Sequence, residues 1–272
     1  MTVQRSHSPR ARRRLAAAVA VTTAVLTTAT LIAGPASAAS TRVAQVAMLC
    51  RSRQRMTVHT SSGTRYVVKN DNYGGRPECL AVRGRWPNFT VTNSSALSRN
   101  KEPQAYPFIL YGCSWGTCSP KSELPRQVSA LNRPSATWDT SQHASGKWDA
   151  SFDIWFGRHA MTTGQAPTEM MIWLNARHVK VSKHTRKVWL DGARWYFLHW
   201  RTCHHGACWR YTQFRRVRAV TGVHGLRLTP FIHELEAKHW VRPSWYLEAI
   251  DAGFELWHGG AGLATTWFSA RA

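Results

Sequence analysis

From about residue 65 onward, the chain consists of short apolar runs separated by glycine, proline, asparagine and aspartate. Runs of this length between turn-forming residues predict β-strands, and many such runs in one chain predict an all-β sandwich or barrel. No internal repeat or low-complexity segment interrupts this pattern. The predicted strands include residues 65–69, 89–92, 106–111, 152–156, 195–200 and 264–269.

The most informative predicted strand covers residues 167–175. Successive side chains of a strand point to opposite faces. One face of this strand holds three apolar side chains, Met170, Ile172 and Leu174. The other face holds Glu169, Met171 and Trp173. Because an unpaired carboxylate is costly to bury, we expect Glu169 to line a cleft, although an ordinary solvated strand face is the simpler alternative.

Two further acidic residues also lie beside aromatic side chains. Glu255 stands between Phe254 and Trp257, and strand alternation places Asp153 on the same face as Trp155. An aspartate next to a glutamate raises the pKa of one of them or shares a proton with it. We therefore expect both Trp155 and the tryptophan beside Glu169, Trp173, to contact a substrate, with burial in the core as the alternative.

One segment departs from the β pattern. Thr229 can cap a helix and Pro230 suits its first position, which predicts a short helix over about 229–241. The segment contains His233 followed by a glutamate, but the next histidine, His239, comes six residues later. A metalloprotease helix needs its two histidines four residues apart, so this pattern excludes that function.

The N-terminal segment 1–38 has the features of a secretory signal peptide. Five arginines precede a weakly apolar stretch at 15–32, and Ala-Ser-Ala at 36–38 is a suitable cleavage site. We expect removal of this segment, secretion, and a single catalytic domain over 39–272. The alternatives are an uncleaved membrane anchor and, because of Arg13-Arg14, export by the twin-arginine route.

Composition and charge narrow the possible functions. The chain of 272 residues is 43% hydrophobic and contains 14 tryptophans, more than a core of this size needs. The formal net charge is +22, and loss of the signal segment removes five arginines and no acid, which leaves +17. Such a surface attracts acidic polymers. The basic residues follow no nucleic-acid-binding motif, so we interpret the charge as a general surface property.

The six cysteines all follow the predicted signal segment, and an exported chain with an even number of cysteines favours disulfides. Two pairs are separated by only four residues, which suits the closure of small loops. The sequence predicts the pairs Cys113–Cys118 and Cys203–Cys208, which leaves Cys50–Cys79. The alternative is a zinc site made from His199, Cys203, His204, His205 and Cys208.

Two carboxyl groups that flank one bond are the chemistry of glycoside hydrolysis. The chain resembles glycoside hydrolase family 12, the small β-jelly-roll endoglucanases, especially the secreted actinobacterial type. The motifs that carry the resemblance, in the family's order, are YVVKN at 66–70, GCSWGTC at 112–118, SFDIW at 151–155, TEMMIW at 168–173 and AGFELWHGG at 252–260.

The resemblance implies a jelly-roll sandwich of two antiparallel sheets and a set of site residues. Glu169 matches the nucleophile, Glu255 the acid/base, and Asp153 the aspartate that hydrogen-bonds the nucleophile. Met171 matches the methionine near the bound sugar, and Trp115 falls in the cleft-lining loop that Cys113–Cys118 closes. The family pattern also supports Cys50–Cys79.

The sequence departs from the family's pattern in three respects, one of which is its unusually strong positive charge. Tyr73 stands where the family usually has a tryptophan that stacks on a glucose, so this sugar-binding position is expected to be weaker. Residues 178–222 match poorly, and Cys203–Cys208 resembles an added cross-link. These departures concern substrate range more than the bond-breaking residues.

The sequence therefore predicts a secreted, retaining endo-β-1,4-glucanase that needs no metal or organic cofactor. Its expected partner is a β-glucan polysaccharide, with cellulose, xyloglucan and mixed-linkage glucan left open. We expect a monomer that binds no specific nucleic acid, leaves the membrane after signal removal, and attaches weakly to acidic polymers. The alternative functions are a non-catalytic carbohydrate-binding lectin and a cationic protein that binds cell walls or polyanions.

Overall fold

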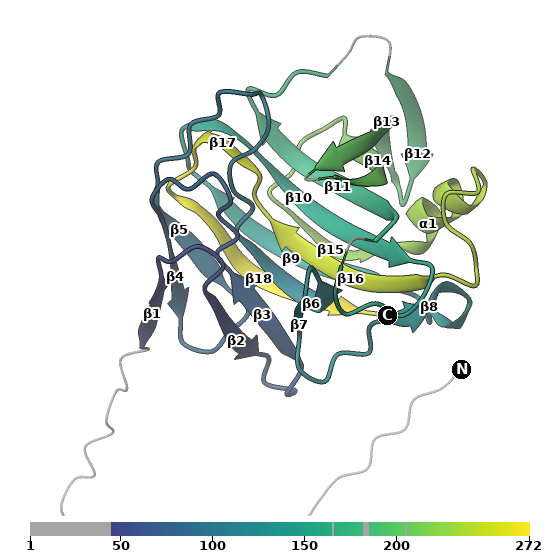
Figure 1. Ribbon diagram of the computed structural model, residues 1–272, viewed down its shortest axis with the longest axis horizontal. Helices are drawn as coiled ribbons and strands as arrows, with labels where there is room; N and C mark the ends of the chain where they lie inside the picture. Colours follow the sequence, from purple (N-terminus) through teal and green to yellow (C-terminus); the bar gives the residue numbers. More distant parts are fainter. Residues whose placement is uncertain (1–44, 165, 182–184, 205) are drawn as a thin grey trace, which may run out of the picture. The chain divides into compact units, whose positions relative to one another are not determined.

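The computed structural model describes residues 45–272 except 165, 182–184 and 205 (Figure 1). The predicted signal segment 1–38 and His205 of the alternative zinc site lie outside the described residues. The described chain forms two β-sheets, one α-helix and a short 3-10 helix, η1 (Val128–Ala130). This is the all-β architecture that the spacing of apolar runs predicts.

The smaller sheet is entirely antiparallel, and its order differs from the order of the chain. A strand from the end of the chain lies between strands from its middle, so the sheet joins distant segments. Its strands in spatial order are β1 (Val46–Leu49), β4 (Glu78–Arg83), β5 (Phe89–Ser94), β18 (Leu263–Arg271), β9 (Ser135–Gln142) and β15 (Gly222–Arg227).

The larger sheet holds the long central strands. Its spatial order is β12 (Arg186–Leu190), β13 (Ala193–His204), β14 (Ala207–Arg216), β11 (Thr168–Arg177), β10 (Gly146–Gly157), β16 (Tyr246–Gly253), β6 (Phe108–Ser114), β3 (Arg65–Lys69) and β2 (Arg55–His59). Three short strands extend it, namely β17 (Leu256–Gly259) on β10, β7 (Thr117–Cys118) on β6, and β8 (Arg126–Gln127) on β16.

One pairing in the larger sheet is parallel, which the expectation of two antiparallel sheets did not include. Strands β11 and β14 run in the same direction, with Glu169 opposite Tyr211. Parallel neighbours need a long connection between them. Here the chain leaves β11, builds the antiparallel strands β12 and β13, and returns as β14 beside β11.

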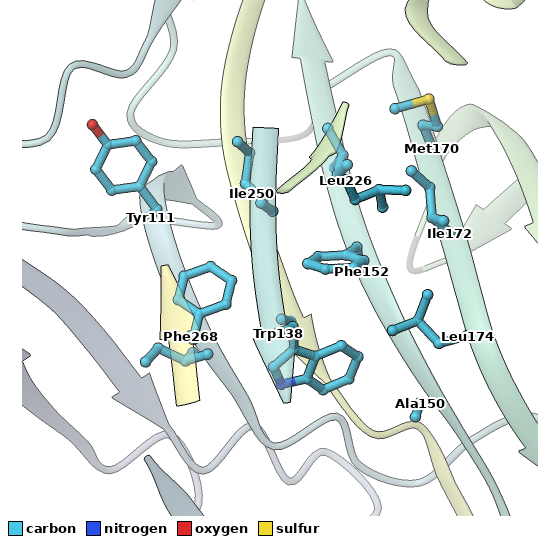
Figure 2. Close-up of a cluster of buried hydrophobic side chains, with 14 of the residues drawn as sticks. Tyr111, Trp138, Ala150, Phe152, Met170, Ile172, Leu174, Leu226, Ile250 and Phe268 are labelled. Atoms are coloured by element: carbon cyan, nitrogen blue, oxygen red, sulfur yellow. The ribbon is translucent and has the colours of Figure 1, made fainter. Parts of the chain in front are cut away.

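The main core lies between the two sheets, and its large side chains come from both. Trp138 of the smaller sheet packs against Phe152 of the larger one, with ring centroids 5.3 Å apart, and donates a hydrogen bond to Thr265. Figure 2 shows Phe152 beside Ile172 and Leu174 of the neighbouring strand. Of the other tryptophans, Trp148 and Trp195 are buried in this core, and Trp240 and Trp245 pack against it.

The helix α1 (Thr229–Glu236) begins where the sequence predicts and ends earlier. Its N-cap is Leu228, so Thr229 is the first helical residue and not the cap. The prediction that the helix reaches residue 241 is wrong, because His239 has a φ of 56°. The amide of the next residue, Trp240, bonds back to Leu235, which closes the helix end with a Schellman-type turn.

All three predicted disulfides are present, and the described residues contain no free cysteine. Cys203 and Cys208 face each other across β13 and β14, so neither is available as a zinc thiolate. Cys113–Cys118 joins β6 to β7, and Cys50–Cys79 ties the N-terminal strand region to β4. In the part of the chain that the structure describes, no helix is long and apolar enough to cross a membrane.

We predict that mass spectrometry of the non-reduced protein finds these three pairs and no free thiol. Replacing Cys203 and Cys208 together with serine should lower the free energy of unfolding by about 2 kcal/mol, because a small closed loop restricts the unfolded chain. Denaturant unfolding of the variant against the parent protein measures this loss. Free thiols at both positions with stoichiometric bound zinc would contradict the pairing.

Candidate active site

Strands β10 and β11 place three of the predicted residues on one face of the larger sheet. On β11, Met170 and Ile172 enter the main core, so Glu169 and Met171 point to the opposite face. The register pairs Met171 with Asp153 of β10, which therefore lies diagonally across from Glu169. We call this side of the sheet the acid face. Glu169 is 6% exposed and Asp153 is 9% exposed, so both carboxyl groups are largely removed from water.

Glu255 reaches the same face from the break between β16 and β17. Its neighbours Phe254 and Leu256 are buried in the main core, and their packing turns the glutamate the other way. The backbone carbonyl of Glu255 accepts a 3.1 Å hydrogen bond from the amide of Asp149 on β10. Just before it, Gly253 lets β16 lie close to β6, because a Cβ there would clash with the carbonyl oxygen of Pro107. Glu255 is partly exposed.

Two indole groups donate hydrogen bonds to these acids. Trp209 of β14 donates to Oε2 of Glu169, and Trp155 donates to Oδ2 of Asp153 at 3.0 Å. Trp209 was not predicted from the sequence, because it lies in the segment with no recognisable motif. The parallel pairing of β14 with β11 brings it to Glu169. An N–H donor at a carboxylate favours its charged form.

The predicted aromatic residues gather around these acids. Trp115 is 49% exposed and meets Trp155 and Trp209 edge-on, with ring centroids 5.8 and 6.3 Å away. Tyr73 is 46% exposed; burial raises the pKa of its hydroxyl well above the usual range, and the charge of Glu255 raises it further. The structure thus brings Trp115 and Tyr73 to the edge of the acid group, with an open ring surface at each.

Met171 and Trp173 form a small cluster of their own on the acid face. Tyr211 donates a hydrogen bond to the Met171 sulfur at 3.1 Å, and the Trp173 indole donates to it at 3.5 Å. Trp257 packs against Trp173 at 6.1 Å. Trp173 and Trp155 are each 5% exposed, yet both belong to clusters separate from the main core. Neither lies in the main core, and their expected contact with a substrate stays a prediction.

Burial raises the pKa of Glu169 well above its usual range, and the negative charge of Asp153 raises it further. The hydrogen bond from Trp209 acts in the opposite direction. Burial likewise raises the pKa of Asp153, with Glu255 as the next cause. Because each acid raises the pKa of its neighbour, these acids do not ionise independently and titrate as a group.

Asp149 is an acid near the site that the sequence did not single out, although strand alternation places it on the same face of β10 as Asp153. It is fully buried, accepts a 2.7 Å hydrogen bond from Ser151, and is hydrogen-bonded to the Glu255 side chain. Burial raises the pKa of Asp149 to about 6, and its bond to Glu255 lowers it. Burial, the Asp149 charge and this bond all raise the pKa of Glu255. The charge of Asp149 and its bond to Glu255 thus both favour the protonated form of Glu255.

The acids of this group have no basic partner at ion-pair distance in the described parts of the chain. The ion pairs there do not include Asp149, Asp153, Glu169 or Glu255. No cluster of three or more histidine, cysteine or acidic side chains suited to a metal ion occurs among the described residues either. The site therefore contains two glutamates with different neighbours. Glu169 has Asp153 and the Trp209 indole, and Glu255 has Asp149.

Comparison with known proteins finds a matching family and solved structures of similar fold. Residues 64–272 match the family described as Glycosyl hydrolase family 12. A metagenome-derived family 12 endoglucanase is 34% identical, with 84% of this chain and 97% of that one covered and a TM-score of 0.74. Endoglucanase Cel12A from Rhodothermus marinus is 35% identical, with 83% and 98% covered and a TM-score of 0.73. Endoglucanase S of Pectobacterium parmentieri is 28% identical over 200 residues, 70% of each chain.

The protein therefore belongs to glycosyl hydrolase family 12. The matched range includes residues 178–222, which the sequence motifs alone did not connect to the family. In the structure, strands β12, β13 and β14 occupy most of that segment and supply Trp209 and Tyr211 to the acid face.

We predict that Asp149→Asn lowers the pKa of Glu255. In the parent protein, the negative charge of Asp149 and its carboxylate acceptor both favour the protonated form of Glu255. The substitution removes both. A carbon NMR titration of protein labelled at the glutamate carboxyl carbons measures this shift. Ser151→Ala is the matched control, because it removes a donor to Asp149 and keeps the charge beside Glu255. An unchanged Glu255 titration in Asp149→Asn would show that the pair is not coupled.

Proposed function

We propose that the protein is a secreted, retaining endo-β-1,4-glucanase. The observation that carries the proposal is the pair Glu169 and Glu255 on one face of a family 12 fold, with opposite hydrogen-bonding arrangements. Glu169 receives an N–H donor, which favours the carboxylate that a nucleophile needs. Glu255 faces the acid Asp149, which favours the proton that a general acid needs.

In the proposed mechanism, Glu169 attacks the anomeric carbon while Glu255 protonates the departing sugar oxygen. The glycosyl group then forms an ester with Glu169. Glu255, now ionised, removes a proton from water, which attacks the anomeric carbon and releases Glu169. Retention needs about 5 to 5.5 Å between the two carboxyl groups. Proton NMR of the first-formed reducing end tests this outcome.

Asp153 is proposed to let Glu169 ionise inside a buried site. Its Oδ2 accepts the bond from Trp155, whereas its Oδ1 has no hydrogen-bond partner within the described residues. A proton on Asp153 removes the nearby negative charge that raises the pKa of Glu169. The protonated group can also donate a hydrogen bond to ionised Glu169, which lies on the neighbouring strand.

The glucan substrate is proposed from the family and from the relatives, which are endoglucanases by name. The exposed rings of Trp115 and Tyr73 beside the acids suit the flat faces of glucose units. An activity panel on cellulose, xyloglucan and mixed-linkage glucan would identify the preferred polymer. The presence of both glutamates disfavours the alternative of a non-catalytic lectin.

We predict that Glu169→Gln abolishes hydrolysis of soluble glucan and leaves binding largely intact. The amide has nearly the shape of the acid and can no longer act as the nucleophile. Loss of one member of a catalytic unit lowers kcat by orders of magnitude. Reducing-sugar release measures turnover, and calorimetry with a cello-oligosaccharide measures binding. A variant that keeps more than about a tenth of parental turnover would overturn the nucleophile assignment.

We predict that Glu255→Ala loses most activity on polymer but much less on an aryl glycoside with an activated leaving group. Such a leaving group departs without a proton, so the general acid is not needed for the first step. Azide should then accelerate the variant, because it attacks the glycosyl-enzyme without a general base. Equal loss on both substrates, with no response to azide, would show that Glu255 is not the acid/base.

A further inference from the structure

A row of aromatic side chains crosses the larger sheet through the position of Glu169. The strand register aligns Trp155 of β10 with Glu169 of β11, then with Tyr211 of β14, and then with Trp200 of β13. Residues aligned across strands by register lie on the same face of a sheet. Trp200 therefore lies on the acid face, two strands beyond Glu169.

Trp200 is held in a defined orientation by its neighbour in this row. Its ring stacks on Tyr211 with centroids 4.1 Å apart and an angle of 29° between the planes. Tyr211 is 8% exposed and is fixed in turn by its hydrogen bond to the Met171 sulfur. Trp200 is 45% exposed, so a large part of its indole is open to solvent although Tyr211 fixes the orientation of the ring.

The strands that carry this ring pair are cross-linked close to it. Strands β13 and β14 are paired from Trp195 to His204, and the disulfide Cys203–Cys208 joins them three residues beyond Trp200. Side chains on paired strands are positioned more precisely than side chains on loops. A ring fixed in this way loses little conformational entropy when a ligand stacks on it, which favours binding.

We propose that Trp200, supported by Tyr211, is a further sugar-binding position for the glucan chain, on the β14 side of Glu169. This inference rests on the proposed function of the acid face. Neighbouring strands lie about 4.8 Å apart, so Trp200 is about 10 Å from Glu169 across the sheet. A polymer that follows the row crosses the nucleophile strand and reaches the exposed ring of Trp200 on its β14 side.

The chemistry of the ring fits a pyranose unit. One face of a β-linked glucose ring presents its axial C–H groups, and the electron-rich face of an indole attracts such weakly positive hydrogens. Hydroxyl groups at the sugar's rim stay in water, because Trp200 lies at an open part of the sheet. The interaction is made equally with the ground state and the transition state, so it should lower KM and leave kcat unchanged.

The first test compares the parent enzyme with Trp200→Ala on a soluble β-glucan polymer. We expect KM to rise by about tenfold, the loss that 1.4 kcal/mol of stacking gives, with kcat near the parental value. Trp200→Phe, which keeps an aromatic face, should recover most of the affinity. Trp86→Ala is the matched control, because Trp86 is 49% exposed and lies between β4 and β5 of the other sheet.

The second test measures binding without turnover. Calorimetry compares cellohexaose binding to Glu169→Gln with binding to the double variant Glu169→Gln and Trp200→Ala, and we expect about tenfold weaker binding in the latter. Unchanged KM and unchanged affinity, or equal effects from Trp86→Ala, would overturn the sugar-binding position. If the parent protein hydrolyses no glucan, the proposed function fails, and the calorimetry still decides whether Trp200 binds the oligosaccharide.

Discussion

The site depends on the alternation of side chains along β10 and β11, which sends successive residues to opposite faces of the sheet. Residues on both faces of these strands are buried. Phe152, Ile154 and Phe156 are anchored in the core between the sheets, and this packing forces Asp153 and Trp155 outward. A shift of either strand by one residue would put a carboxyl group into the apolar core. The large buried side chains therefore fix the positions of the acids more firmly than any contact among the acids themselves.

The acid face also shows how charge is distributed in a strongly basic protein. The chain has 36 lysines and arginines and 14 acids, yet Asp149, Asp153, Glu169 and Glu255 stand together without a basic partner at ion-pair distance in the described residues. A neighbouring arginine or lysine would lower the pKa values of these acids and leave no proton to donate. In the proposed mechanism, the lack of a basic partner at ion-pair distance among the described residues therefore helps Glu255 to keep its proton.

Local patterns in the sequence predicted most of the fold and the main acids. Strand alternation identified the face that carries Glu169 and Met171, and the resemblance extended this reading to Glu255. Asp149 was within reach of the same alternation rule, since it lies four residues before Asp153. Its position beside Glu255 depends on a backbone hydrogen bond between β10 and the segment after β16, which the local sequence does not predict.

The residues that were missed depend on pairing between distant strands. Trp209 and Tyr211 reach the acid face because β14 lies parallel to β11, and no local periodicity encodes that neighbour. The end of the helix was misjudged for a related reason. His239 adopts a left-handed conformation that its residue type does not demand, so propensity alone extended the helix too far.

The place of β18 in the smaller sheet determines when this protein can fold. The strand covers Leu263–Arg271 and pairs with β5 on one side and with β9 on the other. Until these residues leave the ribosome, the two halves of that sheet have no strand to join them, and the apolar inner face of the larger sheet has an incomplete cover. The smaller sheet should therefore close only after Leu263–Arg271 have been made, and nascent chains that lack this strand would expose strand edges prone to aggregation.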